Sequence, residues 1–311
     1  MPRVVVALGG NALLRRGDED SADVMRANAR RAAERVAEVA EHGWEIVVTH
    51  GNGPQVGRIL LQNEAASEWV HPMPLDVCGA ESQGQIGYLL QVTIGDVFYE
   101  RGMERPVATV ITFARVRPDD PAFENPTKPI GPHYEEAQAK RLAKERGWVV
   151  AAESEGKWRR VVPSPRPYSI VEAPVIRQLA ESGAIVIAGG GGGVPVIEEG
   201  PRLVGVEAVV DKDLAGAILA RDVEAQTFLI CTDVEGVYEA YGTPEQKLLD
   251  RLSVTDAKRM VEDGTLPAGS MGPKVEAAIE FLEHGGERAI VCALDDAPNA
   301  LEGNAGTAIA P

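Results

Sequence analysis

The sequence is short of cysteine and has no spacing that would make its cysteines a metal site. Its three cysteines, Cys78, Cys231 and Cys292, lie far apart and form no C-x-x-C pair. An odd number of widely spaced cysteines argues against a disulfide framework and predicts buried thiols in a reducing cytoplasm. We therefore expect three free thiols and no metal centre built by the protein's own side chains.

Positive charge and long apolar runs are also scarce. The chain has 31 Lys and Arg against 47 Asp and Glu, a net charge of −16. Such a field repels nucleic acid, so local cations and backbone donors must hold any anionic substrate. The first apolar run, residues 4–8, is too short for a membrane span and is followed by charged residues rather than a cleavage site. We expect a cytoplasmic protein with no nucleic-acid or membrane partner.

Lysine is rarer than arginine, which makes three of the lysines conspicuous. Eight of the 31 basic residues are lysines, leaving 31 − 8 = 23 arginines. Lys128, Lys212 and Lys274 lie in rigid Pro, Gly or Asp contexts, and Asp213 follows Lys212 directly. A compact ammonium follows a moving phosphoryl group better than a planar guanidinium does. These four residues are our candidate catalytic groups, with Asp213 orienting the lysines and Asp211 a further candidate for that task.

Glycines interrupt the chain after several predicted strands. The apolar run at residues 4–8 (VVVAL) predicts a buried strand of a parallel sheet, and Gly9 and Gly10 end this strand. Similar breaks follow at residues 50–54, 189–193 and 269–274. Glycine lets backbone N–H groups approach a ligand, and several such turns on one sheet edge suggest phosphate binding. The candidate phosphate-binding residues are Gly9, Gly10, Asn11, Gly51, Asn52, Gly53, Gly190 and Gly191. His50 is open to two interpretations, a ligand or base and a structural loop histidine.

Strands and helices alternate along most of the chain, which predicts an α/β fold with a parallel sheet. Expected helices cover residues 21–43, 75–101, 212–221, 255–262 and 275–284, with a further one starting at Pro54, and expected strands cover 4–8, 45–49, 107–115, 184–188, 226–232, 287–294 and 305–310. Glycines within 75–101 favour close packing, and a subunit partner is one candidate for it.

Residues 117–167 differ in character from their surroundings. Prolines cluster around one charged helix at 135–146 and two short strands at 149–153 and 158–162. A structureless loop of roughly 50 residues would be unusual inside a compact domain. We expect an inserted subdomain or lid with proline-stiffened hinges.

These motifs together resemble the amino acid kinase family. They are residues 7–12, 49–57, 74–76 with 82–84, 128–132, 161–165, 205–213 and 269–274, and they run from end to end of the chain. The resemblance implies a three-layer αβα sandwich with an open, mainly parallel central sheet and a small protruding α/β lid. It also implies a homodimer and a reversible, Mg²⁺-dependent transfer of a phosphoryl group between ATP and carbamate, giving ADP and carbamoyl phosphate, in arginine metabolism.

The resemblance also assigns roles to parts of the chain. It implies an N-terminal lobe of residues 1–216 that binds the small anion and forms the dimer, and a nucleotide-binding lobe of residues 217–311. Asp233, Tyr238, Met271 and Lys274 are its candidate nucleotide-binding residues. Many members of the family have a lysine where this chain has Ala7. Lys128 resembles the lysine that supplies the positive charge in its place. Mg²⁺ would be held by ATP oxygens and water.

Two other functions remain open at this level. One is a kinase of another small carboxylic acid on the same fold, and the other is a non-catalytic sensor of nucleotide or carbamoyl phosphate. Three candidate lysines argue against a sensor, which has no transition-state charge to neutralise. A Rossmann dehydrogenase is excluded because no G-x-G-x-x-G opens the first helix.

Overall fold

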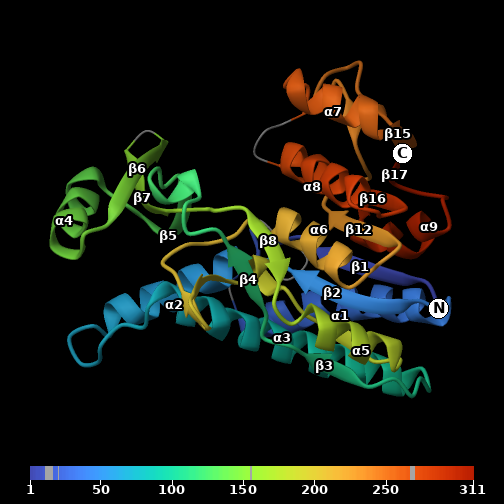
Figure 1. Ribbon diagram of the computed structural model, residues 1–311, viewed down its shortest axis with the longest axis horizontal. Coiled ribbons are helices and arrows are strands. Elements are labelled where there is room, and N and C mark those ends of the chain that lie inside the picture. The colour runs from blue at the N-terminus through green and yellow to red at the C-terminus, as the bar shows by residue number, and fades with distance from the viewer. Residues whose placement is uncertain (11–16, 20, 155, 267–269) are drawn as a thin grey trace.

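The computed structural model describes residues 1–10, 17–19, 21–154, 156–266 and 270–311. Its centre is an eight-stranded sheet in the order β15-β17-β16-β12-β1-β2-β9-β3 (Figure 1). The strands are β1 (Arg3–Leu8), β2 (Glu45–His50), β3 (Val107–Thr109), β9 (Ile185–Ile187), β12 (Thr227–Thr232), β15 (Arg251–Ser253), β16 (Arg288–Ala293) and β17 (Thr307–Ala310). Among the described pairs of this sheet, β16 and β17 are antiparallel and the others are parallel.

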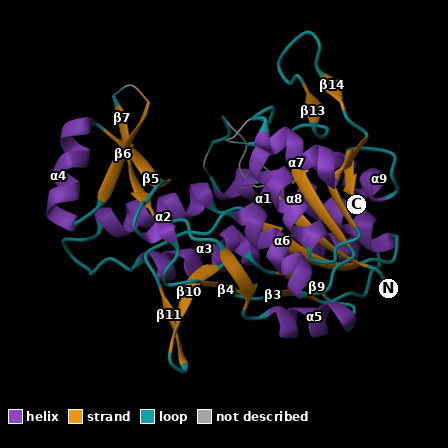
Figure 2. Cartoon of the chain, turned by 45° about the horizontal axis from the view of Figure 1, so that its top comes forward, coloured by secondary structure: helices purple, strands orange, loops and turns teal. Residues whose placement is uncertain are grey.

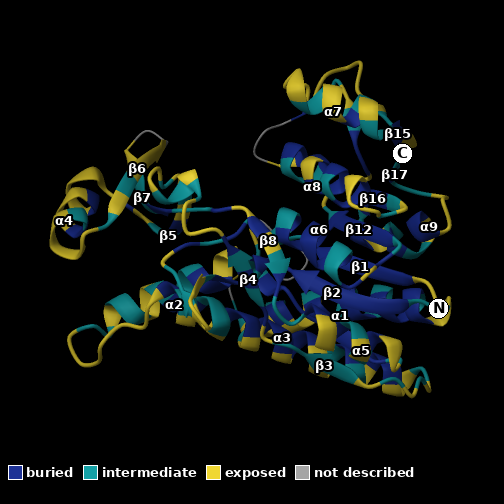
Figure 3. Cartoon of the chain, viewed as in Figure 1, coloured by how far each residue is buried: buried dark blue, intermediate teal, exposed yellow. Residues whose placement is uncertain are grey.

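Helices cover both faces of this sheet. Alternate residues of β1 face opposite sides, so that Val4 packs in one hydrophobic core and Val5 in the other. The first core takes α1 (Ala22–Glu41), α3 (Leu75–Glu100) and α9 (Ala297–Leu301). The second takes α5 (Ala173–Glu181), α6 (Lys212–Asp222), α7 (Val254–Glu262) and α8 (Met271–Glu283). This is the predicted three-layer sandwich, with both faces of the sheet buried (Figure 3).

Several predicted element boundaries are confirmed. Ser21 caps α1 by accepting a hydrogen bond from the Val24 N–H, and α3 runs over the expected residues. Helix α8 begins at Met271, before the expected start, so Lys274 lies in its first turn rather than in the preceding loop. Within the described ranges, every helix is too short or too polar to span a lipid bilayer.

The single strand expected at residues 107–115 was wrong. It is two strands in different sheets, because β4 (Phe113–Val116) belongs to a second sheet with β8 (Pro167–Ile170), β10 (Val194–Glu199) and β11 (Arg202–Gly205). The side chain of Gln83 explains the break. It accepts from the Thr112 N–H at 2.9 Å and donates to the Thr112 carbonyl at 3.0 Å, so this residue is removed from the ladder of the main sheet.

The segment at residues 117–167 protrudes from the sandwich and carries its own small sheet, in the order β5-β7-β6 (Figure 1). Its elements are η2 (Pro121–Phe123), β5 (Lys128–Tyr134), α4 (Glu136–Arg146), β6 (Val149–Ser154) and β7 (Lys157–Val162). Strand β5 was missed in the sequence because Pro129 and Pro132 break the usual pattern. Proline is tolerated at a sheet edge, which is where β5 lies. We call residues 117–167 the lid.

The remaining described elements are a helix, a hairpin and two short turns. Helix α2 (Gly53–Ala65) runs from the sheet edge toward the lid, and the hairpin of β13 (Tyr238–Glu239) and β14 (Lys247–Leu248) projects near the C-terminal part of the sandwich (Figure 2). The turn η3 (Gly190–Gly192) follows β9, and the turn η4 (Leu294–Asp296) follows β16. Ala217, expected to mark the boundary between the lobes, lies within α6.

Candidate functional site

The carboxyl ends of three neighbouring parallel strands meet at one edge of the main sheet. Leu8 of β1 is in register with His50 of β2 on one side and with Cys231 of β12 on the other. The next residue, Gly9, donates its N–H to the Cys231 carbonyl at 3.1 Å. A Cβ on Gly9 would lie 2.9 Å from that oxygen, so the first turn requires glycine. Such an edge is where ligands bind in open α/β sheets.

Two of the predicted glycine loops are in direct contact. A Cβ on Gly190 would lie 2.5 Å from the His50 ring, and one on Gly191 would lie 2.1 Å from Asn52 Nδ2. Gly191 also has a φ of +65°, which side chains disfavour. The structure therefore brings the candidates Gly51, Asn52, Gly53, Gly190 and Gly191 together. Asn11 lies outside the described residues.

A hydrogen-bond network under these loops was not found from the sequence. Thr49 donates to the Gly189 carbonyl at 2.9 Å, and Thr112 Oγ1 accepts from the Gly189 N–H at 2.9 Å. Asn52 Nδ2 donates to Ser82 Oγ at 2.8 Å. Thr49 could have been found from the sequence as a polar residue at the end of a buried strand. Thr112 could not, because its position depends on the bend between two sheets.

His50 is a structural residue of this edge. Its side chain is 2% exposed, and Nδ1 lies 2.9 Å from the Gly51 carbonyl, to which it donates. Burial lowers the pKa of His50 to about 4, against a smaller opposing effect of the bond to Gly51. A neutral, enclosed imidazole supports the loop and is not placed to take a proton from a bound substrate.

The first turn of α6 gathers the three predicted lysines. Asp211 caps the helix by accepting from the Asp213 N–H at 3.0 Å and the Leu214 N–H at 3.3 Å. Lys212 Nζ lies 2.6 Å from Asp213 Oδ1, and Lys274 Nζ lies 3.4 Å from Asp213 Oδ2. The Asp213 side chain is 7% exposed, so one buried carboxylate holds two ammonium groups from α6 and α8.

The third lysine reaches this turn from the lid. Lys128 Nζ lies 3.1 Å from Asp211 Oδ2. Burial of Asp211 opposes ionisation, but the Lys128 ammonium and the two backbone donors outweigh it and lower the pKa of this carboxyl below its usual range. Asp211 therefore remains ionised at neutral pH, and together with Asp213 it fixes all three lysines.

The lysines adjoin the glycine loops. A Cβ added to Gly51 would lie 3.2 Å from Lys212 Cδ and 3.4 Å from the Cα of Gly10. The side chain of Lys212 thus passes over the turn at Gly51, which itself packs against Gly10. Ammonium groups and backbone donors at one edge form a site for a multiply charged anion, as phosphoryl transfer requires.

Of the nucleotide-binding candidates, Lys274 is joined to this edge through Asp213, and the other three follow β12 in the chain. Asp233 follows the end of β12 and accepts from Thr232 Oγ1 at 3.1 Å. Tyr238 lies on β13, where its hydroxyl donates to Glu235 at 2.7 Å, and Met271 opens α8. Across the described part of the chain, no three His, Cys, Asp or Glu side chains are grouped to hold a metal ion.

The comparisons with known proteins agree with this geometry. The family model described as "Amino acid kinase family" matches residues 2–293. The chain is 52% identical to the carbamate kinase of Thermococcus kodakarensis over 312 residues, covering 99% of each chain. It is 53% identical to that of Pyrococcus furiosus over 311 residues, again 99% of each. The solved structure of Giardia lamblia carbamate kinase bound to AMP-PNP superposes with a TM-score of 0.94 at 42% identity, covering 99% of this chain and 98% of that one.

Proposed function

The chain belongs to the amino acid kinase family, and on that premise we propose that it is a carbamate kinase, which catalyses ATP + carbamate = ADP + carbamoyl phosphate. The observation that carries the proposal is the convergence of Lys128, Lys212 and Lys274 on Asp211 and Asp213. Full-length relatives of this name at about half identity support the same acceptor.

The mechanism is direct in-line transfer of the phosphoryl group. Such a transfer needs alignment and neutralisation of the equatorial oxygens rather than a covalent protein intermediate. Lys212, which lies over the turn at Gly51, and Lys128, which enters from the lid, bridge the acceptor and the transferred group. Lys274, from the first turn of α8, holds phosphate oxygens on the nucleotide side.

Backbone donors complete the anion site. The turns after β1 and β2 present the N–H groups of Gly10, Asn52 and Gly53 to carbamate and to the transferred phosphoryl group, while the N–H groups of Gly9 and Gly51 hold the turns by donating to the Cys231 and Leu8 carbonyls. Asn11, a candidate from the sequence, is proposed as a further donor. Gly190 and Gly191 close the opposite side. Each donor of this kind contributes roughly 3 to 4 kcal/mol to stabilising the transition state.

Mg²⁺ fits this site as part of the nucleotide. Asp211 and Asp213 are both engaged by lysines, so ATP oxygens and water would hold the ion. When bound, it neutralises charge on the β- and γ-phosphate oxygens. The lobe of residues 217–311 would bind the nucleotide, with Asp233, Tyr238 and Met271 as the walls of its pocket and the lid closing over the acceptor.

We also propose a homodimer formed through α3. Val77, Tyr88, Val92 and Tyr99 line one face of this helix and are 36%, 57%, 41% and 87% exposed. Gly84 and Gly95 lie on the same face, and a Cβ added to either would meet open space. Replacing Tyr88 with Glu should convert the dimer to monomer in analytical ultracentrifugation, and an unchanged mass would contradict this face. Three unpaired cysteines favour a cytoplasmic location.

The deciding experiment is a coupled assay of ATP formation from ADP and Mg²⁺. Carbamoyl phosphate, acetyl phosphate and acetylglutamyl phosphate are compared as donors. Rapid ATP formation from carbamoyl phosphate alone is the expected result. Preference for acetylglutamyl phosphate would move the acceptor to another small acid, and nucleotide binding without any turnover would favour a sensor.

A further inference from the structure

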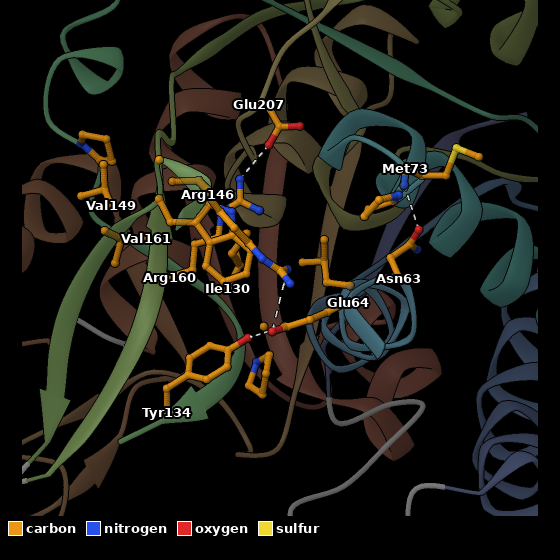
Figure 4. A pocket seen from close by; sticks show the side chains of 18 of the residues that line it. Asn63, Glu64, Met73, Ile130, Tyr134, Arg146, Val149, Arg160, Val161 and Glu207 are labelled. Carbon is orange, nitrogen blue, oxygen red and sulfur yellow. Dashed lines mark hydrogen bonds and ion pairs between the residues drawn. The ribbon is translucent and has the colours of Figure 1, made fainter. Parts of the chain in front are cut away.

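A cavity of about 630 Å³ lies between the lid and the outer end of α2 (Figure 4). Its walls come from β5 and β7 on one side and from α2 and the segment after it on the other. Lid and sandwich are thus not packed together throughout. Away from the base of the lid, the described polar contacts at the edges of this cavity hold the lid at its angle to the sandwich.

Glu64, in the last turn of α2, makes the contacts at one edge. Its Oε2 accepts from the hydroxyl of Tyr134 at 2.8 Å, and its Oε1 lies 3.8 Å from Arg146 Nη1 (Figure 4). Tyr134 ends β5 and Arg146 ends α4. The Glu64 side chain is 19% exposed and Tyr134 is 8% exposed, so the contact is largely shielded from water. One carboxylate therefore ties two elements of the lid to α2.

Glu207 makes a second contact across the cavity. Its Oε2 lies 2.7 Å from Arg160 Nη2 of β7, and its Oε1 accepts from the Leu75 N–H at 2.8 Å. Because Glu207 also binds the first residue of α3, its removal would disturb the sandwich itself. The described contacts of the Glu64 side chain are both with the lid. Replacing Glu64 therefore tests the position of the lid without directly removing a contact within the sandwich.

The base of the lid packs against α2 between Glu64 and the anion site, so a movement of the lid would pivot there. Ile130 of β5 and Val162 of β7 pack in one cluster with Val56 and Ile59 of α2. Lys128 lies two residues before Ile130 and Tyr134 lies four residues after it, on the same strand. Strand β5 is bulged between Ile130 and Tyr134, which pair with Arg160 and Trp158, two residues apart on β7. At about 3.3 Å per residue, both arms are therefore roughly 7 Å along the strand. A swing of the Tyr134 end shifts Lys128 by a similar amount.

We propose that Glu64 is a positioning residue for the phosphoryl transfer, because it holds Tyr134 and Arg146 against α2 and thereby sets the place of Lys128 at Asp211. This inference rests on the proposed function. Glu64 touches neither substrate nor reacting atoms, so its effect passes through β5. A misplacement of about 1 Å can cost roughly a hundredfold in rate, and a looser lid samples such displacements.

The test compares Glu64→Ala with Glu68→Ala in the carbamoyl phosphate assay. Glu68 is exposed in the turn after α2 and has no hydrogen bond or ion pair to another described residue. Glu64→Ala should lower kcat about tenfold and leave KM for ADP unchanged, while Glu68→Ala should match the wild type. Glu64→Gln, which still accepts from the Tyr134 hydroxyl, should recover part of the loss.

A double variant separates positioning from general damage. If Tyr134→Phe acts through the same contact, adding it to Glu64→Ala should reduce kcat no further than Glu64→Ala alone. Hydrogen exchange supplies a readout besides activity. In Glu64→Ala, the amides of β5 should exchange faster while those of β1 stay protected.

The outcomes distinguish the two proposals. If the wild type forms no ATP from any donor, the proposed function fails and the role of Glu64 in it falls with it. If the wild type is active and Glu64→Ala equals Glu68→Ala in kcat, the inference is overturned alone. Unchanged exchange in β5 would also overturn it, whatever the activity.

Discussion

Lys128 Nζ lies 3.1 Å from Asp211 Oδ2, so the first residue of β5 in the lid pairs with the cap of α6, 83 positions further along the chain. The pair joins the lid to the anion site. Asp211 also accepts two backbone N–H groups, which fixes the carboxylate and hence the ammonium. The catalytic role proposed for Lys128 follows from this placement and can be tested directly.

Lys128→Ala should lower kcat for ATP formation by roughly 10² to 10³, the loss typical of one positioned transition-state donor. The fold should survive, because the Lys128 side chain is 44% exposed. Lys140→Ala is the matched control. This lysine lies on α4 in the same lid and pairs with exposed Glu136. Equal kcat values for the two variants would remove Lys128 from the mechanism.

Lys212→Ala and Lys274→Ala should each lose at least as much turnover while remaining folded. Both contact Asp213, so each variant leaves that carboxylate with one lysine. Steady-state kinetics and circular dichroism check the two parts of the prediction. Lys258→Ala, at a side chain on α7 that is 46% exposed, serves as the control. Activity near the wild-type level in both variants would show that the site is wrongly assigned.

Gly191→Ala should destabilise the chain more than Gly200→Ala does. Both glycines have a left-handed φ, +65° and +61°, so both variants place a Cβ on a residue with a strained φ. A Cβ at 191 would lie 2.1 Å from Asn52 Nδ2, whereas one at 200 meets open space. We expect an extra loss of about 1 to 3 kcal/mol from overpacking. Urea unfolding of the two variants measures the difference, and equal stabilities would contradict the loop contact.

His50 should make stability depend on pH between about 4 and 6.5. The unfolded chain binds a proton at His50 near the ordinary histidine pKa of 6.5, whereas burial lowers the pKa in the folded chain to about 4. In this window the unfolded state holds more protons, so stability falls as pH falls. Linkage gives a loss of about 2 kcal/mol at pH 5 relative to pH 8.

Chemical unfolding at both pH values measures this effect. His50→Gln should remove about that much of the pH dependence, while His42→Gln, at a side chain 50% exposed, should retain it. Identical pH dependence in the two variants would mean that His50 is not the group responsible.

Much of the sandwich was predictable because local pattern and burial agree there. The apolar run of β1 is buried on both faces, and Ser21 caps α1 as its position indicates. The strand at residues 107–115 was wrong because its break depends on Gln83, a side chain from α3 that binds the backbone of Thr112. Strand β5 was missed because Pro129 and Pro132 suit only a sheet edge, and edges are set by neighbours rather than by sequence.

The sequence by itself determined the kinds of residue at the site: rare lysines in rigid contexts, aspartates beside them, and glycines after strands. Those features depend on nearest neighbours along the chain. The tertiary structure decided which aspartate holds which lysine, since Lys128 meets Asp211 while Lys212 and Lys274 share Asp213. It also decided that His50 is neutral and that Glu64 contacts the lid, because burial and contacts between distant segments arise only when the chain is packed.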